Sequence, residues 1–135
     1  MTQRESAPAM TGLVIGVLVA LGFALLIGLL PESLFLQAHW RVGVYVVCAG
    51  AAPPTVLFVQ WIARIRGLDQ RAVFTWAAAG AMTFDGLAIG FAPFLYGQTG
   101  QALAWVASAL IFAFASLLVA GQIMLGNRAA ATVHR

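Results

Sequence analysis

The residue best suited to chemistry is Asp85, the one carboxylate within residues 75–97, an apolar run long enough to cross a lipid bilayer. An ionised side chain near the middle of a bilayer costs about 2.5 to 3.5 kcal/mol on insertion scales, so such residues are functional candidates. The predicted spans contain no Lys, Arg or His to neutralise it, which favours the protonated acid at rest. Asp85 can then exchange a proton, or bind a cation once it is ionised. The same pattern also allows a neutral Asp85 that only joins its helix to a neighbour.

A second polar feature is expected at the same depth, because two adjacent prolines interrupt residues 42–63. Proline lacks a backbone donor and clashes with the carbonyl four residues earlier, which leaves free acceptor oxygens inside a helix. Asp85 lies eleven residues before Tyr96, and Pro53 lies eleven after Val42, which places both about 16 Å deep. Broken helices beside membrane carboxylates form cation and proton sites in transporters. We therefore predict one proton or cation site composed of Asp85, Ala49, Gly50, Pro53, Pro54 and Thr55. The alternative is a kink that serves only the shape of the helix.

Few other side chains offer chemistry. The chain has one cysteine, Cys48, which excludes an internal disulfide and a cysteine-based zinc site. The two histidines, His39 and His134, lie outside the apolar runs on opposite sides, which excludes paired haem ligands. Nucleophiles, bases and metal ligands outside the bilayer are too few to assemble an active site. We predict no enzymatic activity, no cofactor and no metal site.

The elements that must position Asp85 follow from composition. Of the 135 residues, 62% are hydrophobic and 8% are charged, which is typical of an integral membrane protein rather than a soluble domain. We predict an all-α membrane protein, a bundle of four transmembrane helices forming one domain. The expected order is a disordered N-terminal segment at 1–10, spans at about 11–30, 42–63, 72–95 and 102–125, and a basic cytoplasmic tail at 126–135.

The arginines predict the orientation of these spans. Arg41 falls on one side of the four-span arrangement, and the other arginines fall on the opposite side: Arg4, Arg64, Arg66, Arg71, Arg128 and Arg135. Cytoplasmic loops carry an excess of Lys and Arg, so both termini are expected in the cytoplasm. Seven scattered arginines without a basic run do not form a nucleic-acid surface, despite the net charge of +3.

Small residues at regular spacing predict where the helices touch. In lipid, helices associate through close backbone approach rather than hydrophobic burial. The first span carries a small residue at every fourth position, which we call the small-residue stripe: Gly12, Gly16, Ala20, Ala24 and Gly28. In the third span Ala81, Asp85 and Ala88 share one helical face, so Asp85 is expected to point into protein.

The second half of the chain carries a resemblance. The segment MTFDGLAIGFAPFLY (residues 82–96) places a central aspartate in an apolar span, followed by a short turn and an apolar fourth span. The proline-containing segment CAGAAPPTVLF (residues 48–58) fits the same outline. This pattern resembles a family of small bacterial integral membrane proteins with four helices and no assigned activity. The resemblance implies the architecture, the bacterial inner (cytoplasmic) membrane and attention to Asp85, and it implies no role for that residue.

Two functions remain open. The first is a proton- or cation-linked pathway for a small solute or ion, centred on Asp85. The second is a non-catalytic accessory or scaffolding subunit whose small-residue stripe docks on a larger membrane partner. In either case we expect the lipid bilayer as solvent, and a homo-oligomer or a larger membrane partner. The Asp85→Asn variant separates the two, because it abolishes flux in the first case and affects only stability in the second.

Overall fold

Residues 3–133 fold as four long helices with two short ones at their connections. The computed structural model describes the backbone of residues 3–133 and the side chains of residues 6–126. The elements in order are α1 (Gln3–Gly28), α2 (Ser33–Leu36), α3 (Ala38–Ile65), α4 (Gln70–Phe91), the 3-10 helix η1 (Pro93–Tyr96) and α5 (Gly100–Val133). Four of them, α1, α3, α4 and α5, are long and apolar enough to cross a membrane. This is the number of spans that the sequence predicts.

The helix ends differ from the predicted ones at several places. α1 begins at Gln3, inside the segment expected to be disordered, and α5 continues to Val133, through most of the expected tail. α4 ends at Phe91 rather than near residue 95. Its C-cap residue, Ala92, has a non-helical backbone (φ −138°, ψ 52°), because Pro93 disfavours the helical conformation in the residue that precedes it. The chain then forms η1 instead of extending the span.

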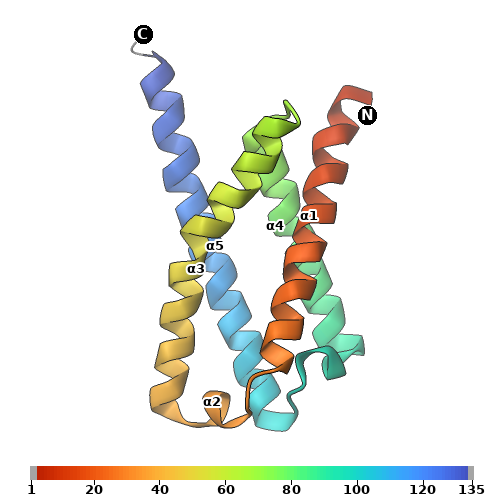
Figure 1. The fold of residues 1–135 in the computed structure, drawn as a ribbon, viewed down its shortest axis with the longest axis vertical. Helices are drawn as coiled ribbons and strands as arrows, with labels where there is room; N and C mark the ends of the chain where they lie inside the picture. Colours follow the sequence, from red (N-terminus) through yellow and green to blue (C-terminus); the bar gives the residue numbers. More distant parts are fainter. Residues whose placement is uncertain (1–2, 134–135) are drawn as a thin grey trace.

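The long helices alternate in direction, and both termini lie at the same end of the bundle (Figure 1). The α3–α4 turn is at this end, which we call the termini end. At this turn Gly67 takes a left-handed conformation (φ 62°), and the Leu68 amide donates to the Ala63 carbonyl at 2.9 Å, which ends α3. The Asp69 carboxylate accepts a hydrogen bond from the Ala72 amide at 2.8 Å and so begins α4. The opposite end holds α2, η1 and the α4–α5 connection, and we call it the α2 end.

The four long helices form two closely packed pairs. α1 packs most extensively on α4, and α3 on α5, whereas α1 and α3 touch at few points. In the first pair, a Cβ added to Gly12 would lie 2.6 Å from the Val73 carbonyl oxygen, and one added to Gly80 would lie 2.8 Å from that of Leu13. Only glycine permits this approach of the two backbones. The small-residue stripe of α1 therefore lies against α4 and the η1 region within the same chain.

The second pair is held by aromatic and polar contacts. Tyr45 of α3 shares a 2.8 Å hydrogen bond with Ser108 of α5 and meets Phe112 edge to face. Near the α2 end, the Arg41 guanidinium lies 3.7 Å from the centre of the Trp105 ring, a cation–π contact.

α3 remains one helix through its two prolines. Figure 1 shows α3 bending near its middle, so that its second half crosses toward α4 at the termini end. Pro53 and Pro54 lie in this central part, and both side chains face the exterior. The bend lets α3 contact α5 over its first half and α4 over its second half, which closes the bundle at the termini end and leaves the α2 half of α3 apart from α1.

Candidate functional site

Asp85 forms a buried pair with Tyr96. The Tyr96 hydroxyl donates a hydrogen bond to a carboxylate oxygen of Asp85 at 2.6 Å, and the side chains of Asp85 and Tyr96 are 5% and 0% exposed. The break at Ala92 makes this contact possible, because η1 turns back over the end of α4 and brings Tyr96 to a residue eleven positions earlier. A continuous helix would hold the two residues about 16 Å apart along its axis.

Tyr96 was not among the predicted site residues, and the separation predicted between Tyr96 and Asp85 was wrong. The count of eleven residues along one continuous helix placed Tyr96 about 16 Å from the carboxylate, whereas the two side chains are hydrogen-bonded. In the structure Asp85 lies only six residues, or about 9 Å along the axis, from the end of α4 at Phe91. The signal that could have corrected this was Pro93, which terminates the helix and leaves Tyr96 free to fold back.

Tyr96 is a neutral donor in this pair. Burial, followed by the hydrogen bond to Asp85 and the proximity of its carboxylate, raises the pKa of the Tyr96 phenol above its ordinary value. The hydroxyl therefore keeps its proton and donates a hydrogen bond to Asp85. This contact fixes the direction in which the carboxyl group points.

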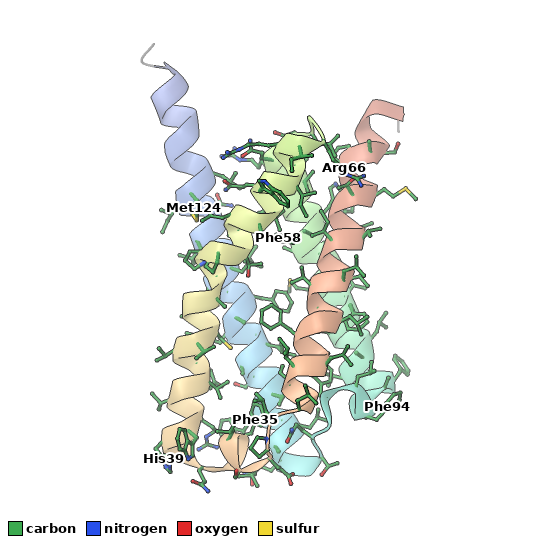
Figure 2. The ribbon with its side chains drawn as sticks, in the orientation of Figure 1. Phe35, His39, Phe58, Arg66, Phe94 and Met124 are labelled. Atoms are coloured by element: carbon green, nitrogen blue, oxygen red, sulfur yellow. The ribbon has the colours of Figure 1, made fainter. Side chains whose placement is uncertain are left out.

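Asp85 and Ala81 of α4 also line a cavity of about 550 Å³ that lies between α1, α3 and α5, with α2 at one end. Almost all lining side chains are apolar, and Asp85, Thr55 and Cys48 are the polar or titratable exceptions. Phe35 of α2, which is 2% exposed, closes the α2 end (Figure 2). A cavity of this size lies within the usual range for small-molecule sites, about 300 to 1,000 Å³.

Only part of the predicted site meets at this cavity. Asp85 and Thr55 both line it, and the Thr55 hydroxyl donates to the Ala51 carbonyl of its own helix at 2.8 Å. Gly50, Pro53 and Pro54 face the exterior and do not line it. Ala49 lines a separate groove on the outer face of α3 and α5. The prediction that these four residues form one site with Asp85 is therefore wrong for this cavity.

Helical periodicity explains why the prolines are absent from the cavity. Residues three or four apart share a face of a helix, and the face of α3 that lines the cavity carries Val44, Cys48, Ala52 and Thr55. Ala49, Gly50, Pro53 and Pro54 follow the same spacing on another face. The prolines and Asp85 were predicted to lie together because they have the same depth. Depth along a helix does not show on which side of α3 the prolines lie.

Two glutamines are buried, and only one of them has hydrogen-bond partners for its side-chain amide. Gln98, after η1, donates its side-chain amide to the Leu30 carbonyl at 2.9 Å and to the Ile27 carbonyl at 3.4 Å, and so caps the end of α1. Gln60 of α3 is 1% exposed, and neither its amide nitrogen nor its oxygen has a hydrogen-bond partner among the described residues. Gln60 does not line the cavity.

The site can exchange a proton and pair with a positive charge. Asp85 is the one Asp, Glu, Lys, Arg or His side chain among the residues that line the cavity, and the described part of the chain has no group of three His, Cys, Asp or Glu residues placed to hold a metal ion. His39 and Arg66 lie at opposite ends of the bundle (Figure 2), and neither lines the cavity. The chemistry of this site is therefore that of one carboxyl group at the edge of an apolar chamber, hydrogen-bonded by a buried phenol that does not line the chamber.

Comparisons with known proteins add no relative. The chain matches no family model, no curated protein sequence and no solved structure.

Proposed function

We propose that this chain is a multi-pass protein of the bacterial cytoplasmic membrane that provides a proton-linked pathway for a small solute, with Asp85 as the proton-carrying group. The observation that supports it best is the position of Asp85, which is buried, hydrogen-bonded by Tyr96 and exposed at one edge to a cavity of about 550 Å³. A carboxyl group that only joined helices would have no need of a chamber beside it. Intramembrane acids that face cavities mark proton and ion pathways.

The proposed orientation places the termini end in the cytoplasm. Arg64, Arg66 and Arg71 lie in or beside the α3–α4 turn at that end, and Arg41 lies at the α2 end. An excess of arginine in short loops on one side is the feature that orients helical membrane proteins. The cavity, which α2 closes at its lower end, then lies in the outer half of the protein.

The proposed cycle uses the Asp85–Tyr96 pair in two protonation states. In the ionised state the Tyr96 hydroxyl holds one carboxylate oxygen of Asp85, and the carboxylate is the negative charge that a solute or proton must neutralise. In the protonated state the same hydroxyl donates to the carbonyl oxygen of the acid, so the pair survives both states without rearrangement. The cavity therefore alternates between carrying a solute and carrying a proton on Asp85.

The accessory-subunit alternative loses the surface that motivated it. The small-residue stripe of α1 is covered by α4 and the η1 region: a Cβ on Gly28 would lie 3.1 Å from the Leu95 carbonyl oxygen, and Ala20 and Ala24 are buried. A larger partner, or a second copy in a homo-oligomer, would have to use another face. The pathway is therefore the function that we retain.

The test uses the full chain in liposomes with a luminal pH dye. Solutes of four classes are added outside: a quaternary lipophilic cation, potassium ions, an aromatic sulfonate and glycerol. We expect at least one of them to drive proton movement in the wild type, and none to do so in Asp85→Asn, whose amide oxygen can still accept from Tyr96. The conservative change keeps the fold, which a thermal unfolding curve equal to wild type verifies. Proton movement that is absent with all four classes, or equal in the variant, would refute the pathway.

A further inference from the structure

We propose that the solute of the cavity is a lipophilic monovalent cation, which enters sideways from the bilayer between α1 and α3. This inference rests on the proposed function and adds the substrate class and the route. Three features carry it: the chemistry of the lining, the single charge, and the open side of the chamber.

The lining excludes strongly hydrated solutes. The Thr55 hydroxyl already donates to Ala51, Cys48 is a weak hydrogen-bonding group, and Trp40 offers one indole N–H, so Asp85 is the only side chain of the lining that can carry a charge at neutral pH. A sugar, an amino acid or a hydrated metal ion would lose its water without replacement, at a cost of about 1 to 3 kcal/mol for each unpaired polar group. An apolar solute loses nothing, and Phe23, Trp40 and Phe114 offer it aromatic surface.

The charge of the site selects a cation among apolar solutes. The cavity-lining residues come from α1, α2, α3, α4 and α5, and apart from Asp85 they include Cys48 but no Asp, Glu, Lys, Arg or His; Tyr96 of η1 donates to Asp85. A cation therefore finds an unopposed carboxylate, whereas an anion of the same shape meets repulsion. Aromatic faces also attract cations, which adds to the preference.

Exchange of a cation for a proton keeps the charge of the site balanced. When Asp85 is protonated, an arriving monovalent cation takes the place of the proton, which leaves to solvent, and the Tyr96 hydroxyl stays on the carboxylate. One positive charge enters for each one released. A divalent or a neutral solute would break this balance. The monovalent class follows from having one carboxyl group in the chamber.

The open side of the chamber faces the lipid. α1 and α3 touch at few points, and the residues on both rims are apolar and exposed: Phe23 is 41% exposed on α1, and Trp40 and Val47 are 52% and 70% exposed on α3. Figure 2 shows side chains from the surrounding helices projecting into this space. Gly43 lies on the α3 rim, and a Cβ built there meets no atom within 4 Å. An apolar solute dissolved in the bilayer can reach the cavity without crossing water.

The first experiment compares two ions of matched shape and opposite charge. Binding of tetraphenylphosphonium and tetraphenylborate to the full chain in lipid nanodiscs is measured by equilibrium dialysis, with empty nanodiscs subtracted. We expect the phosphonium to bind at least about tenfold more tightly than the borate. We expect Asp85→Asn to weaken phosphonium binding at least about tenfold. Asp69→Asn makes the same carboxylate-to-amide change at an exposed residue that does not line the cavity, so it serves as the control and keeps wild-type affinity. Equal binding of both ions would show a cavity that recognises only apolar surface and would overturn the proposal.

The second experiment tests the route and separates this inference from the proposed function. Gly43→Phe narrows the rim, and Gly50→Phe adds the same side chain to the same helix where it is exposed and does not line the cavity. We expect tetraphenylphosphonium to bind at least about fivefold more slowly to Gly43→Phe than to Gly50→Phe, because a bulky ring delays passage without removing Asp85. Equal rates would overturn lateral access. If the liposome assay shows proton movement driven by potassium, the sulfonate or glycerol and not by the phosphonium, the pathway stands and the substrate class is wrong.

Discussion

The close contact between α1 and α4 gives the sharpest prediction on stability. The change is Gly16→Ala, which adds one methyl group where the two backbones meet. That Cβ would lie against the Ala77 carbonyl, 2.8 Å from its carbon and 2.9 Å from the Ala81 nitrogen. Ordinary contact begins at 3.4 Å, so the backbones must separate by more than about 0.6 Å (3.4 minus 2.8). Backbone atoms cannot swing aside as a flexible side chain can.

The expected cost is that of overpacking, about 1 to 3 kcal/mol. The matched control is Gly22→Ala on the same helix, because a Cβ at Gly22 meets nothing within 4 Å. Both variants gain the same helix propensity, up to about 1 kcal/mol, so the difference between them isolates the packing cost. Unfolding free energies are measured by denaturant titration in mixed micelles. A Gly16→Ala variant as stable as Gly22→Ala would refute the assignment of the small-residue stripe to the α1–α4 contact.

Two further predictions concern single hydrogen bonds. Tyr96→Phe keeps the ring and removes the donor of Asp85, so we expect a loss of about 1 kcal/mol in unfolding free energy by the same titration; an unchanged value would contradict the buried pair. Asp69→Ala removes the cap of α4 and should cost about 1 kcal/mol, whereas Asp69→Asn, which keeps an acceptor for the Ala72 amide, should cost little; equal losses would show that the cap is unimportant.

The glycine and proline positions show what was predictable at the ends of helices. Pro93 marks the end of α4, and Gly67 allows the left-handed turn after α3, and both signals are local. The predicted end of the third span at about residue 95 is too late, because α4 ends at Phe91. Had the break been placed at Ala92, the distance argument that separated Tyr96 from Asp85 would have failed, because it assumed one continuous helix.

The sequence by itself determined the number of apolar helices, the even distribution of small residues along α1 and the isolation of Asp85 as the one acid in an apolar run. These are properties of composition and of spacing along one helix, which any fold of the chain must respect. The tertiary structure alone decided that Tyr96 reaches Asp85, that Pro53 and Pro54 turn away from it, and that a cavity lies between α1, α3 and α5. The physical reason is that the position of a residue along a helix axis follows from its number in the sequence. Which face of a helix meets its neighbours depends on the rotation and bend of that helix. Rotation and bend are set by contacts between residues far apart in the chain.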